Sequence, residues 1–406
     1  MTRAKKPRVA ILGAGIMGGS TALYLARKGV NVSLFDAASE PFSAASRWNE
    51  GKIHLGYLYS CDTSLHTARK ILPGSLAFKN MVEDLIGTSI EPAITRTDDI
   101  YLCHQNSLVK PDAMQAYFEA ISQMVTGHPN AANYLSDVSN CQSRRLTKTE
   151  LDNISNTDKI KAGFHVPERS VSTVWIADCF VDALCSQTGI EQFMNSRVTH
   201  VYPEDDNDPD GSWYVKANND IYGPFDYVVN SLWEGRLIID QRVGMELPQK
   251  WTNRYRVSAF LRVNKPLDLP SALIATGPFG DIKNYNGRDF YLSWYPKGLL
   301  IESSAVEPPF VKTPNEEMKQ EFSNEIITAL GKFLPKTSLI RDCIEQVDIR
   351  GGWVFAQGIG ELSDPLSTLH HRSDYGITRK GTYISVDTGK YSTGPWLARQ
   401  IADMVL

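Results

Sequence analysis

Long apolar runs are absent from this chain of 406 residues, and no stretch approaches the roughly 20 apolar residues that span a bilayer. An excess of basic residues is also missing, because 42 lysines and arginines stand against 46 aspartates and glutamates, a net charge of −4. A nucleic-acid-binding surface is therefore not expected. No Gly-x-Ser-x-Gly turn is present, so hydrolysis by a Ser-His-Asp set has no support. These absences favour a small molecule as the partner.

Cysteine pairs of the Cys-x-x-Cys type are missing as well. The six cysteines are scattered: Cys61, Cys103, Cys141, Cys179, Cys185 and Cys343. This usage indicates reduced thiols and predicts a cytoplasmic location. Residues 1–12 superficially imitate a signal peptide, but glycines follow the apolar run at once. We interpret them as a short basic segment followed by a buried strand.

A metal site is not expected. The pair His370–His371, with Asp364 and Asp374 nearby, lacks the helical i,i+4 spacing that brings two imidazoles to one ion. The acidic stretch 205–211 lacks the glutamate that closes a calcium loop, so it is interpreted as a solvated hairpin turn.

The composition is that of an ordinary globular protein, with 42% hydrophobic, 10% aromatic and 22% charged residues. The length suggests two domains or one domain with a large insertion, and no internal repeat is found. Helical patterns cover residues 63–87, 112–125, 176–186, 314–334 and 396–405. Strand patterns cover residues 100–103, 196–202, 212–217, 226–231, 255–263, 288–295 and 382–386.

The first 36 residues carry a nucleotide-binding pattern. An apolar strand at 8–12 leads into Gly13-x-Gly15-x-x-Gly18, a helix follows to residue 28, and a second strand ends at Asp36. The first glycine permits the tight turn, the second lets the backbone approach a pyrophosphate, and the third lets helix and strand pack closely. The helix start supplies N–H donors for the phosphates, and Asp36 is expected to bind the ribose hydroxyls.

The run Gly15-Ile16-Met17-Gly18 is also typical of NAD-dependent β-hydroxyacid dehydrogenases. Those proteins continue into an all-helical domain, whereas residues 196–306 here show strand patterns. This alternative stays open, as does a non-catalytic nucleotide-binding protein.

Two further segments carry a family resemblance. The run Asn49-x-Gly51-x-Ile53-His54-x-Gly56 resembles the D-amino-acid-oxidase superfamily of FAD-dependent oxidoreductases, and L-2-hydroxyglutarate oxidases in particular. The loop 385–393, with Gly389-Lys390, is similar to the Gly-Lys-Leu-Thr-Thr loop of FAD-dependent glycerol-3-phosphate dehydrogenases. The strand 227–230 fits the family's Val-Val-Asn strand, but residues 231–235 replace its small residues.

The resemblance implies an α/β protein with a glutathione-reductase-type, Rossmann-like FAD domain and an inserted antiparallel-sheet substrate domain. It implies FAD-domain segments 1–65, 165–245 and 341–406, and substrate-domain segments 66–164 and 246–340. The FAD contacts would come from three regions. They are Gly13, Gly15, Ile16, Met17, Gly18 and Asp36; Ser46, Arg47, Asn49, Gly51, Lys52 and Ile53; and Val198, Gly389, Lys390, Tyr391, Ser392 and Thr393.

The implied reaction is oxidation of a C–N or C–O bond in a small polar metabolite, such as an amino acid or 2-hydroxy acid, by hydride transfer to flavin N5. Oxygen or a quinone-type acceptor would then take the electrons. The sequence decides neither the substrate, nor the acceptor, nor the oligomeric state, nor whether the flavin is covalently bound.

Four residues are candidates for the substrate chemistry: His54, Arg350, Tyr57 and Tyr291. His54 suits a general base because imidazole titrates near neutral pH, and it is also a candidate for a covalent flavin bond. Arg350 is a candidate anion anchor, because a guanidinium binds an oxyanion with two hydrogen bonds. Tyr57 and Tyr59 would close the site or lie in the core. Tyr291 and Arg288 are expected on opposite faces of a strand, with Arg288 at the surface.

Overall fold

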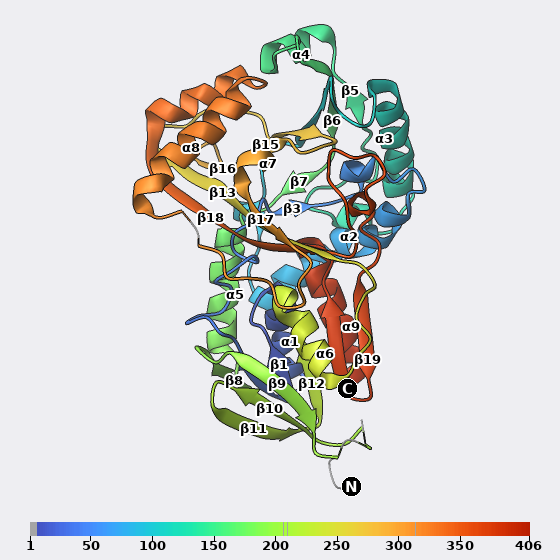
Figure 1. The fold of residues 1–406 in the computed structure, drawn as a ribbon. Helices are drawn as coiled ribbons and strands as arrows, with labels where there is room; N and C mark the ends of the chain where they lie inside the picture. The colour runs from blue at the N-terminus through green and yellow to red at the C-terminus, as the bar shows by residue number, and fades with distance from the viewer. Residues whose placement is uncertain (1–5, 206, 209, 313) are drawn as a thin grey trace.

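The computed structural model describes residues 6–205, 207–208, 210–312 and 314–406. Two large sheets dominate it, one in the lower and one in the upper half of Figure 1. None of the helices within these ranges is long and apolar enough to cross a bilayer. Residues 1–5, the first part of the imitated signal peptide, lie outside the described residues, as do positions 206 and 209 of the expected turn at 205–211.

The lower sheet has six strands in the order β19-β20-β12-β1-β2-β8. All neighbours are parallel except the edge pair β19 and β20. The strands are β1 (Arg8–Leu12), β2 (Asn31–Phe35), β8 (Ile190–Phe193), β12 (Tyr227–Asn230), β19 (Gly376–Lys380) and β20 (Tyr383–Asp387). Continuous burial from Val9 to Leu12 is typical of a parallel strand covered on both faces. Segments that are blue, green and red in Figure 1 thus meet in one sheet.

Helices cover this sheet and present their starts to its carboxyl edge. They are α1 (Ile16–Arg27), α2 (His66–Ile86), α5 (Thr173–Ser186), α6 (Arg236–Val243) and α9 (Gly394–Val405). Buried Leu23, Leu25, Leu397 and Ile401 from α1 and α9 belong to one hydrophobic core. Both α1 and α9 begin directly after glycine-containing loops that follow strands β1 and β20.

The upper sheet has nine strands and is mostly antiparallel. Its order is β17-β13-β16-β15-β14-β4-β6-β5, and β18 pairs with β13. The strands are β4 (Asp99–His104), β5 (Arg144–Arg145), β6 (Ile160–Val166), β13 (Thr252–Val263), β14 (Ala272–Ala275), β15 (Gly280–Asn284), β16 (Asp289–Trp294), β17 (Leu299–Ser303) and β18 (Ile344–Ala356). The expected antiparallel sheet is confirmed, except that β14 pairs with β4 in parallel.

Helix α8 (Glu316–Gly331) covers the outer face of this sheet, as the upper left of Figure 1 shows. Val257, Ala259 and Leu261 of β13 share a core with Phe322 and Ile326 of α8. Side chains alternate along a strand, so Arg254, Arg256 and Ser258 lie on the opposite face. That face is turned toward the parallel sheet.

Smaller elements complete the fold. They are the sheet β11-β10-β9 (β9, Val198–Pro203; β10, Trp213–Ala217; β11, Asp220–Phe225), the pair β3 (Lys52–Ile53) and β7 (Arg169–Ser170), and helices α3 (Pro111–Thr126), α4 (Lys148–Ile154) and α7 (Tyr295–Gly298).

The α/β class and the combination of a parallel with a mostly antiparallel sheet are confirmed. The helix predicted over 63–87 runs from His66 to Ile86, and the one predicted over 112–125 runs from Pro111 to Thr126. The 13-residue strand β18 was not predicted. Paired glycines and several charged residues interrupt its alternating pattern.

Candidate active site

The glycine turn after β1 is packed too closely for any side chain. A Cβ on Gly18 would lie 1.8 Å from the Gly13 carbonyl oxygen, and one on Gly13 would lie 2.7 Å from the Ser231 carbonyl oxygen. Gly13 also has a φ of +94°, which favours glycine. The turn therefore brings bare backbone to the start of α1, where free N–H groups face an incoming anion.

Asp36 and Ser46 hold this turn in place. Asp36 accepts hydrogen bonds from the backbone N–H groups of Ala14 (2.7 Å) and Ala38 (2.8 Å). Ser46 Oγ accepts one from the N–H of Ile16 (2.9 Å), at the first residue of α1. A Cβ on Gly15 would lie 2.7 Å from this hydroxyl. The side chains of Ile16 and Met17 pack into the core and so face away from a phosphate.

The segment that follows Ser46 passes beneath the upper sheet. Asn49 folds it back, because its Oδ1 accepts from the N–H of Gly51 (2.9 Å) and its Nδ2 donates to the carbonyl of Ala45 (2.8 Å). Gly51 is required at φ +66°, since a Cβ would lie 1.8 Å from the Val171 carbonyl oxygen. Arg47 pairs with exposed Asp178 at 2.7 Å, at the outer end of the segment.

His54 lies at the inner end of this segment and is 2% exposed. Its ring centroid is 5.6 Å from that of Tyr59, and its Nδ1 has no hydrogen-bond partner among the described residues. Burial, together with the nearby charges of Lys390, Lys52 and Lys283, holds the pKa of His54 well below its usual value. The imidazole is therefore neutral at neutral pH, with one buried ring nitrogen unused.

A buried ion-pair cluster lies behind His54 and ties the segment to the upper sheet. Lys52 and Lys283 both bind Asp99 Oδ2, Lys283 at 2.8 Å. Glu168 accepts hydrogen bonds from the N–H groups of Leu55 (2.6 Å) and Gly56 (3.1 Å), the two residues after His54. Burial alone lowers the pKa of Lys52, but the carboxylates of Asp99 and Glu168 outweigh it and raise that pKa. Ile53 beside Lys52 is fully buried in the core.

In the loop between β20 and α9, the hydroxyl groups of Thr393 and Ser392 are hydrogen-bonded to other groups of the protein. Thr393 Oγ1 donates to the carbonyl of Thr388 (2.6 Å), and Ser392 Oγ accepts from Ser75 Oγ (3.1 Å). Tyr391 packs on Phe78 of α2 with ring centroids 5.7 Å apart. The hydroxyls of Ser392 and Thr393 were expected to face a flavin, but Lys390 is the polar side chain that the loop turns inward. Its Nζ lies 5.5 Å from the ring centroid of Tyr59.

Three arginines from other elements approach Lys390. Burial and the charges of Arg372, Arg254 and Arg256 lower the pKa of Lys390 to about 7, although the carboxylate of Glu50 acts in the opposite direction. A lysine with this pKa is about half protonated at neutral pH when the site is empty, and an anion bound beside it favours the protonated form.

The depressed pKa predicts a pH-dependent stability. In the FAD-free protein the folded-state pKa of Lys390 is about 7, below the unfolded value of about 10.4. The unfolded chain therefore binds more protons between these values, and the free energy of unfolding rises with pH across that window. In Lys390→Met this contribution is absent. Urea unfolding of the apoprotein at about pH 7 and 10 measures the difference, and Lys265→Met, at an exposed position, is the control. An unchanged slope in Lys390→Met contradicts the assignment.

Arg254 and Arg256 project from the inner face of β13, where they meet Tyr295. Arg254 Nη1 donates to Tyr295 Oη at 3.0 Å, and the Cζ of Arg256 lies 4.5 Å from the Tyr295 ring centroid. The Nε atoms of both arginines are buried without a partner among the residues that the structure describes. These two arginines were missed by the sequence interpretation. The signal was present as two basic residues at alternate positions of a predicted strand.

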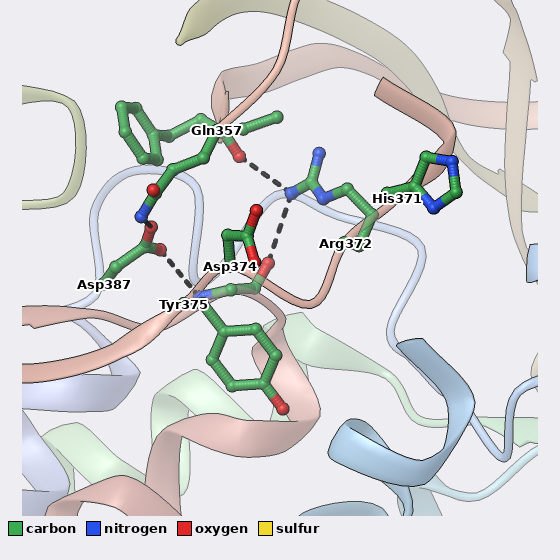
Figure 2. A pocket seen from close by; sticks show the side chains of 9 residues that line it. Gln357, His371, Arg372, Asp374, Tyr375 and Asp387 are labelled. Atoms are coloured by element: carbon green, nitrogen blue, oxygen red, sulfur yellow. Dashed lines mark hydrogen bonds between the residues drawn. The ribbon is translucent and has the colours of Figure 1, made fainter. Parts of the chain in front are cut away.

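Arg372, the third of the arginines near Lys390, lies in the loop before β19. Figure 2 shows its guanidinium directed at two backbone carbonyls, those of Phe355 (2.7 Å) and Gly389 (3.3 Å). Asp387 in the same view accepts from the N–H of Gly389 (3.0 Å) and from Gln357 Nε2 (3.1 Å). Arg372 thus connects the loop before β19 to the Lys390 loop and to the end of β18.

The other candidate residues lie in different surroundings. Arg350 is exposed, with its Cζ 5.6 Å from the ring centroid of Trp48. Tyr57 is fully buried in the core and shares a hydrogen bond of 2.9 Å with Ser122. Tyr291 lies on the inner face of β16 and hydrogen-bonds with Ser258 at 2.9 Å, whereas Arg288 is exposed as expected. Val198 begins β9 at the edge of a smaller core.

The comparisons with known proteins identify the family. A family model described as FAD dependent oxidoreductase (DAO) matches residues 8–404. The chain belongs to this family. The resemblance noted in the glycine turn, the His54 segment and the Lys390 loop is thereby confirmed, and FAD is the cofactor of this DAO-family oxidoreductase.

Solved structures share the fold of this DAO-family protein at low sequence identity. Glycine oxidase from Geobacillus kaustophilus has a TM-score of 0.68 at 14% identity, over 98% of this chain and 95% of that one. Iminodiacetate oxidase from Chelativorans sp. BNC1 has 0.69 at 16%, over 98% and 95%. Dithionite-reduced L-alpha-glycerophosphate oxidase from Mycoplasma pneumoniae with FAD bound has 0.64 at 13%, over 99% and 95%.

The residues present fit FAD. The turn at Gly13–Gly18 and the start of α1 suit the diphosphate, because a Cβ at any of its three glycines would lie 2.7 Å or less from a neighbouring oxygen. Closer to the upper sheet, buried polar atoms of His54, Tyr59 and Arg256 lack partners within the described part of the chain. Such atoms are costly to bury unless a ligand uses them.

Proposed function

We propose that this protein oxidises a C–N or C–O bond in a small metabolite that carries a carboxylate or similar anion close to the reacting carbon. The observation that carries this proposal is the pair Arg254 and Arg256, which lies on the inner face of β13 without a carboxylate within 4.0 Å in the described ranges. Arg254 is buried, and Arg256 is half-buried with an enclosed Nε. A guanidinium without a counter-charge is unfavourable in such surroundings, so an anionic ligand is the natural counterpart.

Each polar group has a distinct part in this proposal. The forked N–H groups of Arg254 and Arg256 bind the substrate anion and orient the carbon that reacts. His54 holds or accepts the proton that leaves the amine or hydroxyl, because its neutral imidazole keeps one unused nitrogen. Tyr295 and Tyr291 close the site against water from the upper sheet. FAD, when bound, supplies the two-electron acceptor.

A spectroscopic experiment tests the proposal. The purified holoprotein is mixed without oxygen with a panel of amino acids and 2-hydroxy acids, and the visible flavin absorbance is followed. We expect at least one acid to bleach the flavin while its uncharged amide or ester analogue does not. Admitting oxygen or a quinone-type dye then shows which acceptor restores the absorbance. If no member of the panel bleaches the flavin, a nucleotide-binding protein without this oxidative activity becomes the better interpretation.

The colour of the acid-precipitated protein tests whether FAD is covalently bound. After acid precipitation, flavin in the supernatant indicates noncovalent FAD, and colour in the pellet indicates a covalent bond. His54 is the candidate for such a bond, and His54→Ala would release the colour.

A further inference from the structure

Two guanidinium groups side by side on one strand are more than a single carboxylate requires. Arg254 and Arg256 are two residues apart on β13, so their side chains share a face, with Cα atoms about 6.5–7 Å apart. One carboxylate is fully bound by one guanidinium fork through two parallel hydrogen bonds. The guanidinium of the second arginine then has no ligand group to bind, and its Nε is still buried and unpaired among the described residues.

Neighbouring acids do not account for the second arginine. Asp281 receives a hydrogen bond from Ser293, and the charges of both Lys283 and Arg256 act to lower its pKa, although no ion pair within 4.0 Å joins Asp281 to Arg256 in the described ranges. Burial raises the pKa of Asp281 and so disfavours its charged form. Asp387 is occupied by Gly389 N–H and by Gln357, and its closest guanidinium is that of Arg236 at 3.9 Å. No described carboxylate lies within 4.0 Å of Arg254 or Arg256.

The remaining cations nearby already have other roles. Arg372 donates to the carbonyls of Phe355 and Gly389, and Lys390 belongs to the loop that opens α9 at the cofactor side. Both add positive potential without offering a free planar fork. Arg254 and Arg256 are therefore the two forks available to a ligand, and they are held apart by the strand and by the ring of Tyr295 between them.

We propose that the substrate is a short dicarboxylate, with one carboxylate on Arg254 and the other on Arg256. This inference rests on the proposed function. It narrows the proposed substrate from a metabolite with one anionic group to a metabolite with two. The two carboxylates are separated by a few carbon atoms, to match the spacing of alternate residues on β13. A monocarboxylate leaves one guanidinium of this inner face without a counter-charge, which selects against it.

The experiment compares matched anions on the purified holoprotein. The probes are succinate and glutarate, their monomethyl esters, and inorganic phosphate, and binding is read from the perturbed flavin absorbance at about pH 8, where both carboxyl groups are ionised. We expect each diacid to bind at least about tenfold more tightly than its monoester. In Arg254→Met and in Arg256→Met this preference falls to about twofold or less, because each variant has lost one fork. Arg262→Met, at an exposed arginine farther along β13, keeps the preference.

The possible results distinguish a failure of the dicarboxylate assignment from a failure of the proposed function. If diacid and monoester bind with equal affinity, or if phosphate binds as tightly as succinate, the dicarboxylate assignment is overturned while the anion site stands. If none of the anions perturbs the flavin, the anion site itself is wrong, and the proposed function fails with it. Should a methionine variant lose its FAD, Arg254→Lys and Arg256→Lys keep the charge but not the fork. They are then expected to lose at least part of the preference, and an unchanged preference in both contradicts the proposal.

Discussion

Replacing Gly18 by alanine is expected to yield a protein without bound FAD. The new Cβ would lie 1.8 Å from the carbonyl oxygen of Gly13 and 2.7 Å from Ser231 Oγ. The first of these is backbone, so relief requires the turn to move away from the start of α1. That movement breaks the close approach that a pyrophosphate needs, and overpacking of this kind also costs about 1–3 kcal/mol of folding free energy. The ratio of flavin to protein absorbance after purification measures the loss.

Two variants serve as controls for Gly18→Ala. Gly331→Ala, at the end of α8, meets no atom within 4 Å and is expected to keep its flavin. Gly15→Ala would bring a Cβ to 2.7 Å from Ser46 Oγ, a hydroxyl that can rotate away. We expect it to weaken FAD binding rather than abolish it. If Gly18→Ala purifies with a full complement of FAD, the glycine turn is not the diphosphate site.

Replacing Asp99 by asparagine is expected to cause a large loss of stability. Asp99 is completely buried and is the shared partner of Lys52 and Lys283. Without its charge, Lys283 has no carboxylate within 4.0 Å among the described residues, although Asp281 still acts on it from farther away. Lys52 keeps only Glu168, at 3.7 Å. Breaking a buried pair in this way costs about 3–5 kcal/mol, because a charge is left uncompensated.

The loss in Asp99→Asn is expected to depend on pH. Burial already lowers the pKa of Lys283, and Asp99 is the charge that opposes this most. In the variant the pKa of Lys283 falls further below its unfolded value of about 10.4. The unfolded chain then binds more protons than the folded protein, so the loss of stability shrinks as pH rises toward that value. Urea unfolding of the holoprotein at about pH 7 and 9 measures both effects. Asp112→Asn, which breaks an exposed pair with Arg145, is the control and is expected to leave the midpoint unchanged. A loss in Asp99→Asn no greater than in this control contradicts the role of the cluster.

Much of the lower sheet and its nucleotide turn could be predicted because the signals are local. The strand, the three glycines, the helix and the acid at the next strand end all fall within 36 residues. Their geometry follows from backbone sterics, since Gly13 and Gly18 meet backbone oxygens that no other residue tolerates. The segments around His54 and Lys390 were found in the same way, from glycines and short polar runs.

The substrate side of the site could not be predicted to the same extent. Arg350 was a candidate because a guanidinium can anchor an anion, and the structure places it at the surface. Arg254 is buried and Arg256 half-buried on the inner face of β13. The sequence does show basic residues at alternate positions of a strand. It does not show which face of that strand meets α8 and which meets the cofactor side.

The sequence by itself therefore determined the α/β class, the dinucleotide turn and the FAD family of this protein. Only the tertiary structure decided which charged side chains lie close to one another. Pairing of β13 with β16, β17 and β18 and the covering of one face by α8 turn Arg254 and Arg256 inward, and Asp99, Lys52 and Lys283 come together from positions up to 231 residues apart. Such contacts depend on long-range register and on which face is buried, and no short stretch of sequence encodes either.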